Sequence, residues 1–150
     1  MLTKSITLKH YKRLDIQQAM LASSQNREVA TRFGDGFGKR PDTLSYTNEI
    51  IELAKQGATS FHVSEEHWNN VVALRPELSK KDLDELRSGW DLVLDIDCKY
   101  WYYSKLITKL LIDQLKSHGI TSITVKFSGS KGFHIGVPFE AFPKTLPLQG

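Results

Sequence analysis

The order of alternating patterns in the second half of the chain constrains its fold more than any other feature. Apolar residues at every second position predict strands at Trp90–Asp97, Thr121–Phe127 and Phe133–Val137. Between the first two strands, apolar residues recur at helical spacing: Leu106, Ile107, Leu110, Leu111 and Leu115. Gly119 then marks the stop of a helix over about Tyr103–His118. This strand–helix–strand–strand order predicts an α+β fold, with a mixed or antiparallel sheet and helices on one face.

Strand alternation also sorts the side chains of these segments onto two faces of the sheet. We expect the apolar set to face the helix: Leu92, Leu94, Ile96, Ile123, Val125, Phe127, Phe133, Ile135 and Val137. The opposite face then receives Asp95, Asp97, Lys126 and His134. Two acids, a base and a histidine therefore converge on one side of the sheet, which makes that face the candidate site.

The first half of the chain is less regular. We expect a helix around Asp15–Ala22, a strand within Arg27–Phe33, a helix over Thr47–Gln56 that Gly57 ends, and a strand over Ala58–Val63. Residues 64–88 are acidic and partly helical, which indicates a surface insertion. We therefore divide the 150 residues, about one domain in length, into a basic N-terminal part (about 1–63), the insertion (64–88) and a core (90–138).

Charge is distributed unevenly along the chain. Residues 1–40 carry eight Lys and Arg against three acids, residues 41–91 carry five against ten, and residues 92–150 carry seven against four. Basic ends around an acidic middle suit a protein that meets phosphates with part of its surface, although ordinary solvated faces would look the same.

Composition excludes several classes of protein. No apolar run approaches the roughly 20 residues that cross a membrane, so we expect no membrane partner. The N-terminus lacks the features of a signal peptide, so we expect a protein that is not secreted and is cytoplasmic, or nuclear in a eukaryote. Cys98 is the single cysteine, which excludes a disulfide framework and a cysteine-based zinc site within the chain.

Asp95 and Asp97 are candidate metal ligands. Carboxylates two apart at a strand end can hold Mg²⁺ or Mn²⁺, because hard cations prefer oxygen ligands. Two such ions about 3.5–4 Å apart can activate a 3′-hydroxyl and steady a leaving pyrophosphate. The alternative is a solvated strand end, since Asp-x-Asp is common. Four apolar residues around the first acid favour the functional interpretation.

A small-residue loop at Ser128–His134 is the candidate triphosphate site. Gly129 and Gly132 allow close approach of an anion to the backbone, Lys131 adds charge, and Ser128 and His134 add side-chain donors. The alternative is a plain hairpin turn. The nearby Asp-x-Asp strand favours phosphate binding, and the glycine spacing differs from that of a Walker A motif.

Four further groups leave two interpretations open. The basic residues Arg27, Arg32, Lys39 and Arg40 could contact phosphates or could only solubilise a loop. The aromatic run Tyr100, Trp101, Tyr102 and Tyr103 could stack bases, but such a run is more often core or a partner surface. His62 could face the site or pack within its strand, and packing is the more common case. Cys98 could be a nucleophile or a buried small residue, and we expect the latter because no Cys–His pairing is visible.

Three features follow one another in the second half of the chain: Leu94-Asp-Ile-Asp97, a helix, and Phe127-Ser-Gly-Ser-Lys-Gly-Phe-His-Ile135. Together they resemble the catalytic core of the archaeo-eukaryotic primase superfamily. The best match within it is the small, catalytic subunit of archaeal and eukaryotic DNA primase. The resemblance implies a recognition-motif-like sheet and template-directed synthesis of short primers from nucleoside triphosphates on single-stranded DNA. There are two alternatives: a repair or plasmid-type primase-polymerase of the same superfamily, or a non-catalytic module that binds nucleotides or nucleic acid.

Carried over to this chain, the resemblance makes Asp95 and Asp97 ligands of two divalent cations. Ser128 and His134 would hold the incoming triphosphate, helped by Lys131 and the backbone of Gly129 and Gly132. Arg27 and Arg40 would belong to the same site.

The chain departs from the family in two respects. A third catalytic carboxylate normally lies well downstream of the serine–glycine motif, and here Glu140, the only later acid, sits too close to it. The usual Cys/His zinc motif is also missing. We therefore expect an N-terminal part of a catalytic subunit, either truncated or one half of a split pair, with a large subunit and a C-terminal continuation or second half as partners.

Overall fold

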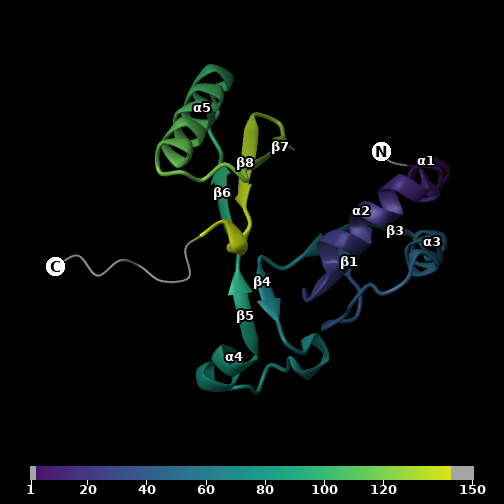
Figure 1. Ribbon diagram of the computed structural model, residues 1–150. Coiled ribbons are helices and arrows are strands. Elements are labelled where there is room, and N and C mark those ends of the chain that lie inside the picture. The colour runs from purple at the N-terminus through teal and green to yellow at the C-terminus, as the bar shows by residue number, and fades with distance from the viewer. Residues whose placement is uncertain (1–2, 143–150) are drawn as a thin grey trace. The chain divides into compact units, whose positions relative to one another are not determined.

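The computed structural model describes residues 3–142, and the chain divides into two compact units, residues 1–89 and residues 90–150 (Figure 1). Both are mixtures of helices and small sheets, and every strand pair with a defined register is antiparallel. The α+β class expected from the sequence is confirmed. Among residues 3–142, no helix is both long enough and apolar enough to cross a bilayer.

The first unit opens with three helices and a small sheet. Its elements are α1 (Lys4–Tyr11), α2 (Leu14–Ser24), β1 (Val29–Phe33), β2 (Gly36–Phe37), α3 (Thr47–Gln56) and β3 (Ala58–Val63). The expected helices at α2 and α3 and strands at β1 and β3 are confirmed, and the structure adds the helix α1. Gly57 ends α3 in the left-handed conformation, at φ +107°.

The core of this unit is built on Val29, Leu44 and Ile50, which are all buried. Tyr11, Met20, Leu21, Leu53 and Phe61 pack against them. The sheet has the order β2-β1-β3, and Val29 pairs with Val63 across β1 and β3. Alternate residues of β1, Val29 and Thr31, are buried, as the alternation of this strand predicts.

The acidic segment after β3 is more structured than a surface insertion requires. It contains β4 (Glu66–Trp68), the 3₁₀ turn η1 (Val71–Ala73), α4 (Lys80–Leu86) and the start of β5 (Arg87–Trp90), which pairs with β4. Trp68 and Val71 are buried. A network joins the two strands, because Arg87 binds Glu66 at 2.7 Å and also pairs with Asp84. Part of this segment therefore contributes to the interior of the first unit.

The second unit has the expected strand–helix–strand–strand order. Its elements are β6 (Leu92–Ile96), α5 (Trp101–Ser117), β7 (Thr124–Gly129), β8 (Gly132–Val137) and the 3₁₀ turn η2 (Phe139–Ala141). The sheet order is β6-β8-β7, so β8 pairs antiparallel with both neighbours. The crossing helix α5 packs alongside β8 and β6 (Figure 1).

The registers confirm the predicted faces. Ile96, Phe133 and Phe127 form one cross-strand row, and Leu94, Ile135 and Val125 form another. Trp101 of α5 stacks on Phe133, with ring centroids 5.3 Å apart, so the apolar face is the one that the helix covers. The cover is incomplete, because Val125 and Phe127 on the edge strand are about half exposed.

Two expected strand boundaries are wrong. The predicted strand Trp90–Asp97 is interrupted at Asp91, because Trp90 belongs to β5 while Asp91 accepts a hydrogen bond of 2.9 Å from the Phe139 N–H. Thr121–Ile123 lie before β7, and the Ile123 N–H donates to the Thr121 carbonyl, which forms a tight turn in place of a strand.

Candidate functional site

The site is centred on a polar row that runs across the three strands of the second unit. His134 on the central strand β8 lies opposite Asp95 on β6 and opposite Lys126 on β7. His134 Nε2 is 3.3 Å from Asp95 Oδ1. Side chains in register on neighbouring strands share a face, and these rows alternate with the apolar rows under α5. An acid, an imidazole and an ammonium group therefore stand together on the face away from the helix.

Both aspartates are accessible to a ligand. The Asp95 side chain is 66% exposed, and Asp97, one residue beyond the end of β6, is also exposed. Neither is engaged with a lysine or arginine within hydrogen-bonding distance in the part of the chain that the structure describes. Exposed carboxylate oxygens suit a hard divalent cation.

A complete metal-binding cluster is absent from the described residues. Between residues 3 and 142, no three His, Cys, Asp or Glu side chains come together in a group that could hold an ion. Glu140 lies in η2, and Asp113 pairs with Lys109 on the exposed side of α5. The donors present thus fit part of a Mg²⁺ or Mn²⁺ site, namely the two aspartates.

The turn between β7 and β8 is shaped by a β-bulge at Ser128. Phe127 pairs with Phe133 and Gly129 pairs with Gly132, so Ser128 is an extra residue that has no partner on β8. Gly129, at φ +106°, supplies the backbone conformation that follows the bulge. A bulge changes the direction of a side chain and is frequent beside active sites. Here it places the Ser128 hydroxyl next to Gly132.

Gly132 is required by close contacts. A Cβ atom at this position would lie 2.5 Å from Ser128 Oγ and 2.9 Å from the Ile96 carbonyl oxygen. The glycine therefore allows the turn, with Ser128, to approach the end of β6 that precedes Asp97. Ser130, at φ +52°, and the exposed Lys131 form the tip of the turn. The second unit thus brings Asp95, Ser128, Gly129, Lys131, Gly132 and His134 onto one short hairpin and its neighbouring strand.

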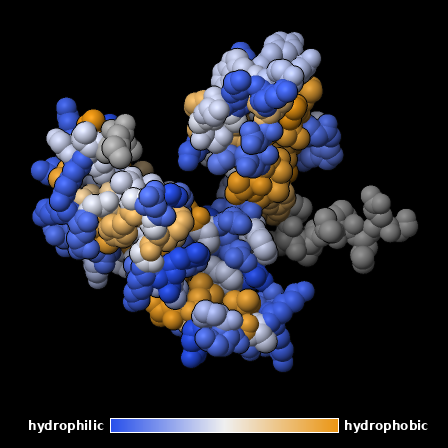
Figure 2. Space-filling model, turned by 180° about the vertical axis from the view of Figure 1, so that it is seen from behind, coloured by the Kyte–Doolittle hydropathy of each residue, from blue (hydrophilic) through white to orange (hydrophobic). Residues whose placement is uncertain are grey.

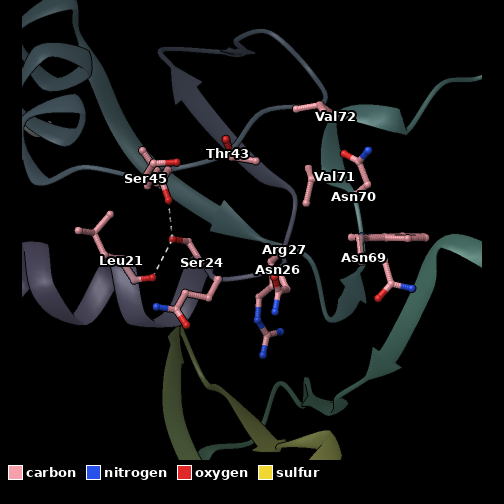
Figure 3. Close-up of a pocket in the computed structure, with 13 residues that line it drawn as sticks. Leu21, Ser24, Asn26, Arg27, Thr43, Ser45, Asn69, Asn70, Val71 and Val72 are labelled. Atoms are coloured by element: carbon pink, nitrogen blue, oxygen red, sulfur yellow. Dashed lines mark hydrogen bonds between the residues drawn. The ribbon is translucent and has the colours of Figure 1, made fainter.

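Arg27 belongs to the first unit, where it borders a cavity of about 550 Å³ (Figure 3). Its guanidinium donates a hydrogen bond of 2.9 Å to the Ser64 carbonyl. The cavity is also lined by Asn26, Asn69 and Asn70, together with the buried Trp68. Arg27 therefore takes part in holding the end of β3 to the start of β1.

Arg40 is also in the first unit and is held by an acid. It forms two hydrogen bonds of 2.8 Å with the Glu28 carboxylate. The hydrogen bonds and the charge of Glu28 raise the pKa of Arg40. Arg40 and Glu28 line a further cavity of about 370 Å³ with His62. The His62 ring meets Phe37 edge-on at 5.5 Å, so it packs against the neighbouring part of the sheet while it stays exposed to solvent.

The aromatic run at the start of α5 is not core. Tyr100, Trp101, Tyr102 and Tyr103 are between 44% and 69% exposed. The buried positions of α5 are Ser104 and Thr108, whose hydroxyls donate to the Cys98 and Ser104 carbonyls. Local hydrogen bonds allow these small polar residues to face the sheet, which leaves Leu106, Ile107 and Leu110 exposed. Cys98 itself is half-buried and free.

No protein-family model matches the chain. The polymerase domain of Mycobacterium tuberculosis ligase D, solved in complex with DNA, has a similar structure, with a TM-score of 0.63 at 20% sequence identity. The match covers 91% of this chain and 55% of that one, so the chain spans about half the length of the neighbour.

A curated relative gives a sequence match without a function. An uncharacterized protein of Methanocaldococcus jannaschii is 42% identical over 62 residues, which are 41% of this chain and 14% of that protein. The structural likeness shows the class of fold, an α+β fold similar to that of the ligase D polymerase domain.

Proposed function

We propose that this chain carries most of a nucleotidyl-transfer centre and is the catalytic-core part of a DNA primase small subunit. It would synthesise short primers from nucleoside triphosphates on a single-stranded DNA template. The observation that supports this most is the row of Asp95, His134 and Lys126, with the Ser128 bulge on the adjoining hairpin. Carboxylates, an imidazole and a hydroxyl beside a glycine turn are the groups that a metal-bound triphosphate needs.

Each residue has a role in this proposal. Asp95 and Asp97 would hold two Mg²⁺ or Mn²⁺ ions, which lower the pKa of an attacking 3′-hydroxyl and stabilise charge on the leaving pyrophosphate. The Ser128 hydroxyl, His134, Lys131 and the N–H groups of Gly129 and Gly132 would bind phosphate oxygens. His134, held 3.3 Å from Asp95, would keep the phosphate site next to the metal site.

The proposal also needs a partner. Since no third carboxylate joins Asp95 and Asp97 within residues 3–142, the remaining ligand would come from elsewhere. We propose a further segment or a second subunit as its source, and a large subunit that assists primer synthesis. Arg27 and Arg40 would meet the template or the nucleotide from the first unit.

The test is nucleotide incorporation by the complete natural protein and by its Asp95→Asn variant, with Mn²⁺ or Mg²⁺. Wild-type protein is expected to make labelled products on an unprimed single-stranded template, whereas Asp95→Asn loses at least a hundredfold in rate. Asp113→Asn, an exposed acid on α5, is the matched control and should retain full activity. Equal activity of Asp95→Asn and wild type would contradict the proposal.

The same assay separates the two alternatives. Products on a primed template alone would indicate a polymerase that extends existing strands, as in repair or plasmid-type members of the superfamily. The absence of a third ligand among residues 3–142 favours, as a second candidate, a binding module without catalysis. Such a module would bind a metal–nucleotide complex and give no product on either template.

A further inference from the structure

The start of α5 exposes an unusual run of aromatic and basic side chains. We define the aromatic–lysine platform as Lys99, Tyr100, Trp101, Tyr102, Tyr103 and Lys105. Its four rings are 55%, 44%, 69% and 53% exposed in chain order. Four consecutive aromatic side chains that remain in solvent are costly unless they are covered by a partner.

The rings are already arranged as a connected surface. Tyr103 meets Tyr100 and Tyr102 edge-on, at centroid distances of 5.9 Å and 5.7 Å. Trp101 contacts the sheet, because it stacks on Phe133 of β8 and meets Phe127 of β7 edge-on at 5.7 Å. Trp101 is thus anchored to the sheet, so this ring loses little side-chain freedom when a ligand binds.

Positive charge accompanies the rings. Lys99 Nζ lies 4.9 Å from the centroid of the Tyr100 ring, and Lys105 Nζ lies 5.6 Å from that of Trp101. No acid occurs between Cys98 and Ile112, and the first turn of α5 has none. In the space-filling view, hydrophobic and hydrophilic surfaces adjoin one another on the second unit (Figure 2).

We propose that the aromatic–lysine platform binds single-stranded nucleic acid by stacking bases on its tyrosines and pairing phosphates with its lysines. Exposed rings interleaved with cations are the chemistry that holds single strands without regard to sequence. An apolar protein partner would need no such cations, and the aliphatic stripe of Ile107 and Leu110 fits that role better. The platform begins at Lys99, two residues after Asp97, so it rests on the proposed function and deepens it by naming the surface that holds the template.

The experiment measures binding of the full chain to a short fluorescein-labelled oligothymidylate by fluorescence anisotropy, without nucleotide or metal. In the double variant Tyr102→Ala/Tyr103→Ala, we expect binding to weaken about tenfold for each base that no longer stacks on a tyrosine ring. Tyr102→Phe/Tyr103→Phe keeps the rings and should bind as wild type does. Tyr46→Ala removes an equally exposed tyrosine from the first unit and serves as the matched control.

A second variant separates charge from stacking. Lys99→Gln/Lys105→Gln should weaken binding and reduce the slope of log affinity against log salt by about 0.7 for each lost phosphate contact. Thermal melts should be unchanged in both sets, because the altered side chains are exposed. The proposal would be overturned if the tyrosine double variant to alanine and the lysine double variant both bound the oligonucleotide as tightly as Tyr46→Ala does. It would also be overturned if Leu110→Ala were the variant that lost binding.

This test is separate from that of the proposed function. Wild-type protein that binds the oligonucleotide through the platform and yet incorporates no nucleotide would contradict only the catalytic proposal. Active protein whose platform variants bind normally would contradict only the platform.

Discussion

His134 on β8 and Asp95 on β6 lie opposite each other on adjacent strands of the second unit, with Nε2 and Oδ1 3.3 Å apart. The pair is formed by residues on two different strands, so the register of the sheet fixes its geometry. Lys126 stands opposite His134 on the other neighbouring strand. A slip of β8 by one residue against its neighbours would turn His134 toward α5 and away from Asp95 and Lys126. The site therefore depends on the packing of the apolar rows beneath it.

The first prediction concerns the role of His134. We expect His134→Ala to weaken nucleoside triphosphate binding about tenfold in the presence of Mn²⁺, because a donor to phosphate is lost. Binding of Mn²⁺ alone should change by less than about threefold, since the aspartates remain. Equilibrium dialysis with labelled nucleotide and Mn²⁺ titration followed by electron paramagnetic resonance measure the two quantities. An equal loss in both would make His134 a part of the metal site instead.

The second prediction concerns the two aspartates as ligands. Asp95→Asn and Asp97→Asn are each expected to lower Mn²⁺ affinity at least about tenfold, because a charged oxygen ligand becomes a neutral one. Both side chains are exposed, so the melting temperature should stay close to that of wild type. Calorimetric titration with Mn²⁺ provides the measurement, with Asp113→Asn as the control. If both variants bind Mn²⁺ as tightly as wild type does, Asp95 and Asp97 are solvent-exposed side chains at a strand end and not metal ligands.

The third prediction tests the hairpin. Gly132→Ala places a methyl group 2.9 Å from the Ile96 carbonyl oxygen and 2.5 Å from Ser128 Oγ, so either the strand or the serine has to move. We expect a loss of about 1–3 kcal/mol in unfolding free energy, together with weaker triphosphate binding. Gly36→Ala is the matched control, because its added Cβ meets nothing within 4 Å. Denaturant unfolding of the two variants should differ clearly, and equal stability would refute the close approach.

Much of the second unit could be predicted from the sequence because alternation is a local property. Once β8 pairs with strands on both sides, the pattern of Phe133, His134 and Ile135 determines which residues share a face. The break at Asp91 could not be predicted, since alternation runs on through Trp90 and Leu92. The choice of partner strand is non-local: Trp90 lies in the strand that pairs with β4, and Leu92 pairs with Val137.

The helix α5 shows a different limit of sequence analysis. Its leucines and isoleucines have helical spacing, but the pattern does not say which face the sheet covers. The sheet side is occupied by Ser104 and Thr108, whose hydroxyls bond to nearby carbonyls. Leu106, Ile107 and Leu110 remain exposed for that reason. Similarly, the bidentate pair of Arg40 with Glu28 joins residues twelve apart, which neither charge counts nor spacing could indicate.

The last prediction uses that pair to decide what Arg40 does. Glu28 holds both guanidinium donors at 2.8 Å, so a phosphate can bind Arg40 only in competition with Glu28. If Arg40 serves the nucleotide or template, Glu28→Gln should strengthen polyanion binding by about threefold, and Arg40→Gln should weaken it by a similar factor. Binding of labelled oligonucleotide and of triphosphate at low salt measures both changes.

A purely structural pair gives a different outcome from the same two variants. Each would then lower the melting temperature, because one partner of a hydrogen-bonded ion pair is lost, and neither would change affinity. Lys39→Gln, at the neighbouring exposed position, controls for the general loss of positive charge. If Glu28→Gln raises the affinity for polyanions while Arg40→Gln lowers it, and Lys39→Gln has little effect, then Arg40 contacts the ligand. A loss of stability alone cannot raise affinity.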